Sequence, residues 1–213
     1  MNKTLKWVLI IAGSGLLIFM GFVFFVFSAF SFDDSKYYSK QDLIDNYNAK
    51  TQQINELSVY INSITPPNKQ VDIEFDGNKK LFIFHVTENG SRDSNWDLKI
   101  NSSKVDTLLQ KLHWTKQTLT ILKEKLDAAN CISIKSGEPC NIGFQRSGMG
   151  KYYYNIFQKP IPDSLKSQYR ASCTYIPYIA KVVLEYGGGA IGPQCFPVDT
   201  IEQKQRQPTT SNF

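Results

Sequence analysis

The first long run of hydrophobic positions extends from Trp7 to Phe32 and contains no charged residue. Twenty of its 26 residues are aliphatic, aromatic or Met. At 1.5 Å rise per residue, a helix of this length spans roughly 39 Å, which is enough to cross the roughly 30 Å hydrocarbon core of a bilayer. We therefore expect a transmembrane signal anchor at residues 7–32, embedded in the lipid bilayer.

The charges on either side of this run predict its orientation. Lys3 and Lys6 precede it, whereas Asp33 and Asp34 follow it. Lysines in a short flank stay on the cytoplasmic side. Residues 1–6 are therefore expected to be a cytoplasmic tail, and the remainder is expected in the periplasm of a bacterium or, alternatively, outside the cytosol of a eukaryote.

A cleaved signal peptide is the alternative to an anchor. Val26–Ser28 would precede a cut at Ala29. The hydrophobic run is much longer than the about 7–15 residues of a signal peptide, and Phe30 and Phe32 continue it past that cut. An uncleaved anchor is therefore favoured.

Residues 33–65 are predicted to contain a juxtamembrane segment and an amphipathic helix. Ser39-Lys40-Gln41-Asp42 has the spacing of a capping box. Six apolar positions then recur at intervals of four and three, interrupted at Lys50, before Pro66 ends the pattern. These positions are Leu43, Tyr47, Ile54, Leu57, Ile61 and Ile64.

Packing of this stripe on the rest of the domain is the favoured interpretation. A parallel coiled coil with a second copy is the alternative, although Lys and Tyr in the seam would weaken it. Ser14, Gly21 and Ser28 in the anchor recur every seven residues, and small side chains let two membrane helices approach closely. These features would allow a homo-oligomer.

Beyond Pro67 the hydrophobic period changes from helical to two, which is typical of strands. Strands are expected around Val71–Phe75, Leu81–Val86 and Trp96–Ile100, with a polar loop at Glu88–Asn95. Two helices are expected next, capped by Ser103 and Thr115. Later strand-like runs are Cys131–Ile134, Asn141–Gln145, Lys151–Phe157, Cys173–Tyr178 and Lys181–Tyr186, with a short helix at Asp163–Tyr169.

The order strands, helix pair, strands predicts an α+β fold. Short connections favour antiparallel neighbours, so residues 66–197 are expected to form a mainly antiparallel sheet with an inserted helix pair. Residues 198–213 are polar and are expected to be a disordered tail.

Charge excludes one class of partner. The net charge is +5, of which Lys3 and Lys6 contribute two. The remaining charge is too small and scattered for a nucleic-acid surface, so no nucleic-acid partner is expected.

All four cysteines fall on the predicted outer side: Cys131, Cys140, Cys173 and Cys195. An even number in an oxidising compartment favours two disulfides, for which three pairings are possible. The turn at Ser136–Pro139 favours Cys131–Cys140 across a hairpin, which leaves Cys173–Cys195.

The best candidate for a binding surface is the segment around residues 146–154. Arg146 and Lys151 lie in or beside a predicted hairpin loop that can hold an anion, with an exposed turn as the alternative. Tyr152, Tyr153 and Tyr154 follow, and tyrosine is common at interfaces because it is amphipathic. Aromatic residues are also good strand formers.

Other motifs give little support for chemistry. Gly187–Gly192 matches G-x-G-x-x-G, but Pro193 follows it, so a tight turn that returns Cys195 to the sheet is favoured over a nucleotide site. Only His85 and His113 could pair with a cysteine thiol in catalysis, and neither adjoins a cysteine as in a metal site. We expect no metal, no cofactor and no catalytic residue.

The layout resembles that of a type IV pilin or pseudopilin: an apolar amino-terminal helix, an amphipathic helix, and an antiparallel sheet with late cysteines. The resemblance would imply an assembly subunit. The processing motif of pilins is absent, because Gly21-Phe22 is followed by no Glu within the span. No family is assigned from the sequence.

The sequence therefore predicts a single-pass membrane protein that presents a disulfide-stabilised α+β domain outside the cytoplasm. Its expected role is non-catalytic, namely binding or scaffolding of a protein partner in an envelope or membrane complex. A membrane-tethered hydrolytic enzyme is the alternative.

Overall fold

The computed structural model describes residues 20–22, 38–147, 149–187 and 192–196. The chain divides into two units, Met1–Lys36 and Tyr37–Phe213. Residues 20–22 are helical; the rest of the predicted anchor, the tail at 1–6 and the tail at 198–213 lie outside the described residues. Within the described part of the chain, no helix combines the length and apolar character that a membrane crossing requires.

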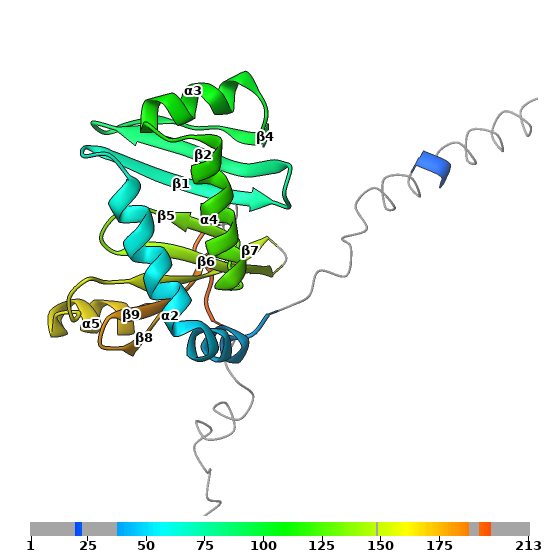
Figure 1. Cartoon of the computed structure of the whole chain (residues 1–213). Helices are drawn as coiled ribbons and strands as arrows, with labels where there is room; N and C mark the ends of the chain where they lie inside the picture. The colour runs from blue at the N-terminus through cyan, green and yellow to red at the C-terminus, as the bar shows by residue number, and fades with distance from the viewer. Residues whose placement is uncertain (1–19, 23–37, 148, 188–191, 197–213) are drawn as a thin grey trace, which may run out of the picture. The chain divides into compact units, whose positions relative to one another are not determined.

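The second unit has the predicted α+β architecture, with a mainly antiparallel sheet and a few helices (Figure 1). An inserted helix pair lies between the first and second groups of strands, as expected. The described helices of this unit are α2 (Lys40–Ile64), α3 (Ser103–Leu112), α4 (Lys116–Ala128) and α5 (Asp163–Arg170).

The strands within the described residues form one sheet of order β3-β2-β1-β5-β6-β7-β9-β8, with β4 paired to β2. Every pairing between them is antiparallel. The strands are β1 (Lys69–Asp76), β2 (Lys80–Glu88), β3 (Ser91–Asp93), β4 (Trp96–Lys99), β5 (Ser133–Lys135), β6 (Cys140–Ser147), β7 (Gly150–Ile156), β8 (Tyr175–Ile179) and β9 (Val182–Gly187).

Helix α2 begins and packs as the sequence predicts. The Ser39 side chain accepts from the backbone N–H of Asp42, whose carboxylate accepts from the Ser39 N–H, so the capping box is formed. Lys50 has non-helical dihedral angles, which kinks the helix where the apolar stripe is interrupted. The stripe is buried in the domain core, so it is not free to form the seam of a coiled coil.

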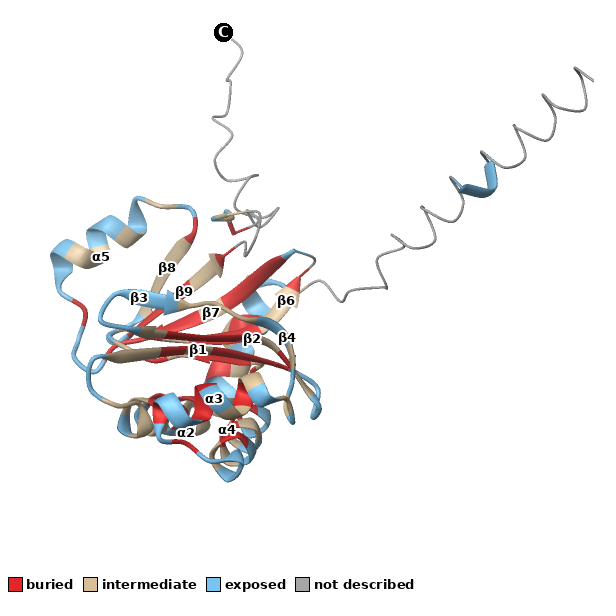
Figure 2. Ribbon diagram, turned by 90° about the horizontal axis from the view of Figure 1, so that it is seen from above, coloured by how far each residue is buried: buried red, intermediate tan, exposed pale blue. Residues whose placement is uncertain are grey.

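Helices α3 and α4 follow the predicted pattern with one correction. Thr115 caps α4 as expected, but α3 is capped by Ser102 rather than Ser103, because the Ser102 hydroxyl accepts from the N–H of Val105. Figure 2 shows α2, α3 and α4 together on one face of the sheet, where the buried strand residues lie.

Strand β3 was not predicted, because Glu88–Asn95 is polar throughout. Ser91–Asp93 pairs with Val86–Glu88 in β2 and lies at the edge of the sheet, where both faces of a short strand are accessible. Such a strand is held by main-chain hydrogen bonds and needs no hydrophobic alternation.

The predicted Cys173–Cys195 disulfide is present, with Cα atoms 4.7 Å apart. The expected Cys131–Cys140 bond is wrong: both are free and buried. In the β5–β6 register, Ile134 pairs with Ile142. Continuing that register puts Cys140 opposite Ser136, so the two cysteines are displaced along the hairpin by about 16 Å at roughly 3.3 Å per residue. A disulfide requires Cα atoms within about 7 Å.

The β7–α2 contact supplies a stability prediction. The buried Tyr154 hydroxyl donates to the Leu43 carbonyl at 2.8 Å and accepts from the Asn46 amide at 3.0 Å. Tyr154→Phe should lower the free energy of unfolding by about 1–2 kcal/mol, because it leaves buried groups without a partner. Urea denaturation measures this change.

Tyr178→Phe is the matched control, since the Tyr178 hydroxyl donates to Asn48 in a solvent-accessible position. Its loss should change stability by no more than a few tenths of a kcal/mol. Equal losses in the two variants would contradict a special role for the buried hydroxyl.

Candidate functional site

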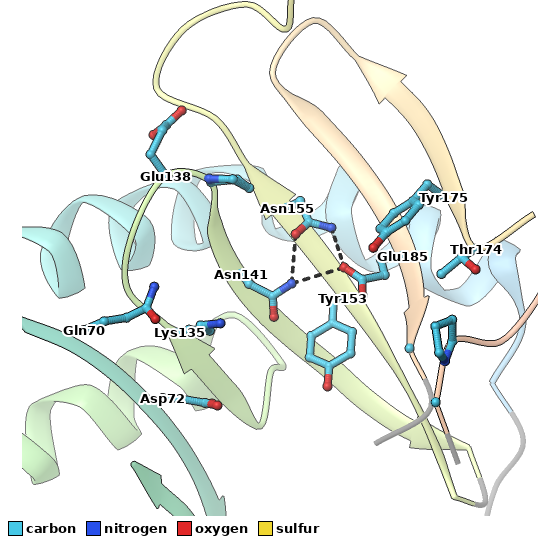
Figure 3. A pocket seen from close by; sticks show the side chains of 14 residues that line it. Gln70, Asp72, Lys135, Glu138, Asn141, Tyr153, Asn155, Thr174, Tyr175 and Glu185 are labelled. Carbon is cyan, nitrogen blue, oxygen red and sulfur yellow. Dashed lines mark hydrogen bonds between the residues drawn. The ribbon is translucent and has the colours of Figure 1, made fainter. Parts of the chain in front are cut away.

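The strands that bury apolar side chains against α2, α3 and α4 present polar side chains on their other face. In β7, Tyr152 and Tyr154 are buried on the helix side, whereas Tyr153 and Asn155 point the opposite way because successive strand residues alternate. This polar face contains a hollow of about 550 Å³, which Figure 3 shows from close by. Its labelled lining residues are Gln70, Asp72, Lys135, Glu138, Asn141, Tyr153, Asn155, Thr174, Tyr175 and Glu185.

A hydrogen-bonded triad of side chains crosses three adjacent strands inside the hollow (Figure 3). The Asn141 amide in β6 donates to the Asn155 side-chain oxygen in β7 at 2.9 Å, and the Asn155 amide donates to Glu185 Oε2 in β9 at 2.8 Å. Asn141 also lies 3.4 Å from Glu185 Oε2. Both amides thus orient the same carboxylate oxygen.

The Glu185 carboxylate is held by amides rather than by a cation. Among the described residues, no lysine or arginine forms an ion pair with it, and its Oε1 accepts no hydrogen bond. Burial raises the pKa of Glu185, and this effect exceeds the opposing influence of the Asn155 amide and of Lys135. The site therefore holds a poorly solvated carboxylate that has spare capacity to accept a hydrogen bond.

The other charged groups of the hollow have partners or stand at its opposite end. Asp72 is bound by Arg92 at 3.2 Å. Glu138 accepts the backbone N–H of Gln158 at 3.0 Å. Lys135 is the cross-strand neighbour of Asp72. Three carboxylates and one lysine line the hollow, so its lining is negative although the chain as a whole is positive.

The disulfide supports one wall of the hollow. Cys195 is bonded to Cys173, and the Phe196 N–H donates to the Cys173 carbonyl at 3.0 Å. These contacts place Gly192 and Pro193 alongside Thr174 at the rim. The predicted return of Cys195 to the sheet is thus observed, while residues 188–191 of the glycine motif lie outside the described residues.

A buried charge cluster lies beside the hollow on the same face. Glu74 in β1 accepts from Lys151 Nζ at 2.7 Å and from Arg146 Nε at 2.7 Å. Lys151 also donates to the Ser133 hydroxyl at 2.9 Å. Burial lowers the pKa of Lys151, against the influence of Glu74. Gly143 makes this approach possible, because a Cβ there would lie 2.0 Å from Ser133 Oγ.

The predicted binding surface is only partly assembled. Tyr153 lines the hollow, but Tyr152 and Tyr154 are core residues whose hydroxyls donate to the Tyr38 and Leu43 carbonyls. Arg146 and Lys151 are both engaged by Glu74, so the expected anion-binding pair is not free.

Sequence reasoning missed Asn141, Asn155 and Glu185. Each occupies the polar position of an alternating strand, a signal that marks the second face of the sheet but does not say which polar residues meet. The cysteine–histidine pairs that the sequence allowed for Cys173 and Cys195 are not formed, because the disulfide removes both thiols. His85 instead accepts the backbone N–H of Asn95 through Nδ1 at 2.9 Å.

The charge cluster predicts strong coupling between Glu74 and Lys151. Glu74→Leu should destabilise the fold by about 3–5 kcal/mol, because it leaves the buried lysine without a counter-charge. Adding Lys151→Met should recover most of that loss. A double-mutant cycle measured by urea denaturation gives the coupling, and additive losses would contradict it.

Removal of the Glu185 charge is expected to stabilise the fold at neutral pH, whereas removal of the Glu74 charge is expected to destabilise it. Its pKa is raised, so the native state favours the protonated form and stability declines as the pH rises above the unfolded value of 4.5. Glu185→Gln should therefore melt at a higher temperature than the native chain at pH 7, and the gain should disappear below about pH 4.5.

Thermal melts from pH 4 to pH 8 check this, with Glu56→Gln on the exposed side of α2 as the charge-matched control. The titrating and charged groups that interact electrostatically with Glu185 are Lys135, Lys151, Tyr153, Tyr169 and Tyr175. A Glu185→Gln protein that is less stable at pH 7 than at pH 4, relative to the native chain, would refute the prediction.

Comparisons with protein-family models, with curated proteins and with solved structures find no match to this chain.

Proposed function

We propose that this chain is a membrane-anchored, non-catalytic binding protein whose hollow receives a polar ligand outside the cytoplasm. The observation that carries the proposal is the Glu185 carboxylate inside a hollow of about 550 Å³, where two amides are its hydrogen-bond partners among the described residues. Ligand sites in proteins have volumes of about 300–1,000 Å³ and contain a few convergent polar groups.

Two further features support the location. The charge-free run Trp7–Phe32 is long enough for an anchor, and Lys3 and Lys6 precede it, which favours a cytoplasmic amino terminus. The Cys173–Cys195 disulfide suits an oxidising compartment. The proposed role of a binding domain held at a membrane in this way is to scaffold an envelope complex.

The network in the hollow favours binding over catalysis. Asn141 and Asn155 fix Glu185 from one side, and side-chain amides do not titrate near neutral pH, so they cannot serve as a general acid or base. Such a network orients the Glu185 carboxylate as a hydrogen-bond acceptor for a ligand.

Location can be tested with a peptide tag added after Phe213. In intact cells that express the full chain, a membrane-impermeant reagent should label the tag from outside the cytoplasmic membrane. Labelling only after that membrane is broken would refute the proposed orientation.

Binding in the hollow can be tested with the full chain in lipid nanodiscs. A panel of polar probes, namely a tripeptide, maltotriose and a nucleotide, should contain at least one member that shifts the backbone amide signals of Tyr153 and Asn155. Ile121 on α4 serves as the remote control. Failure of the whole panel, or turnover of the bound probe, would contradict a non-catalytic binding role.

A further inference from the structure

The geometry points to a specific chemical class of ligand: we infer that the hollow binds a primary ammonium group, which docks against the free oxygen of Glu185. The inference rests on the proposed binding function and adds the identity of the recognised group. It concerns the Oε1 atom, since both amides of the triad contact Oε2.

Gly187 allows the Glu185 carboxylate and the Tyr153 ring to lie close to the backbone of β9. A Cβ at position 187 would lie 3.2 Å from Glu185 Oε1 and 2.9 Å from Cε2 of Tyr153. Gly187, Tyr153 and Glu185 all line the hollow, and a side chain at position 187 would crowd Oε1 of the carboxylate. The preceding residue of β9, Tyr186, points to the opposite face of the sheet, where its ring stacks on Tyr152.

The cations nearest to Glu185 do not neutralise it. Lys151 acts on Glu185 only through space, because its ammonium is bound to Glu74 at 2.7 Å. Lys135 also acts at a distance and forms no ion pair with Glu185 among the described residues. A cation that enters the hollow would therefore give this carboxylate the counter-charge that the described part of the chain does not provide.

An ammonium group satisfies the site better than a neutral donor. Hydrogen bonds between ionised partners are roughly twice as strong as those between neutral ones. The carboxylate is also already desolvated by the fold, so little further hydration is lost when the ligand binds. The excess of carboxylates over lysines in the lining attracts a positive ligand and disfavours an anionic one.

The full chain in nanodiscs of phosphatidylcholine, which carries no net charge, allows a direct test. Four probes are titrated at pH 7 while the amide signals of Tyr153 and Asn155 are followed: trialanine amide, N-acetyl-trialanine amide, n-butylamine and maltotriose. The first two differ by one ammonium, which is charged at this pH because an α-amino group has a pKa of about 7.7–8.0. Glu185→Gln removes the acceptor charge, and Glu56→Gln removes an equal charge from the exposed side of α2.

We expect trialanine amide to bind the native chain at least about tenfold more tightly than its acetylated form. That preference should disappear in Glu185→Gln and persist in Glu56→Gln. If butylamine binds as tightly as trialanine amide, the recognised group is a free amine; if only the peptide binds, it is a peptide amino terminus. Either result supports an ammonium site.

Three outcomes overturn the inference. Equal binding of the free and acetylated peptides would show that the hollow does not recognise the ammonium charge. A preference that survives in Glu185→Gln would show that Glu185 does not recognise it. Binding of maltotriose without the amines would assign the hollow to neutral hydroxyl ligands. In these cases the proposed binding function stands, whereas no response to any of the four probes refutes the ammonium site and also counts against binding in the hollow.

Discussion

The ion pair between Glu74 and Lys151 joins the two halves of the sheet. The first half is the β1–β2 pair with its edge strands, and the second contains β6, β7, β9 and β8. Between them lies β5, which makes only three registered residue pairs with each neighbour. Glu74 and Lys151 are separated by 77 positions in the chain and bridge from β1 to β7 over β5 and β6. The narrowest part of the sheet is therefore reinforced by its most buried charges.

The Glu74–Lys151 ion pair also determines how much positive charge is available near the hollow. Lys151 is the lysine closest in sequence to Tyr153, and its ammonium lies 4.7 Å from the centre of that ring. Because the same ammonium is bound to Glu74, its charge is balanced by that carboxylate at the junction between the two halves of the sheet. Glu185, the cross-strand neighbour of Tyr153, has two amides as its hydrogen-bond partners among the described residues. The ion pair that stabilises the junction of the sheet therefore leaves Lys151 unavailable as a partner for the neighbouring Glu185 carboxylate.

Much of the fold could be predicted because local patterns determine it. The capping residues Ser39 and Thr115, the stripe along α2 and the alternation around Ile73 each depend on neighbours within a few positions. The site depends on pairings between distant segments. The β6–β7 register brings Asn141 opposite Asn155, and a different register would have moved either residue to another partner. The failed Cys131–Cys140 prediction has the same origin.

The three consecutive tyrosines, Tyr152–Tyr154, show most clearly what the sequence alone does not predict. Alternation predicts that Tyr153 faces the opposite side from Tyr152 and Tyr154, but it does not say which side is core. The positions of α2, α3 and α4 decide that question, because they cover the face on which Tyr154 reaches Leu43. The opposite face contains the polar hollow, which Gly187 and Glu185 line. A carboxylate whose pKa is raised by burial weakens the fold at neutral pH, so the position of Glu185 in the hollow is not one that stability favours.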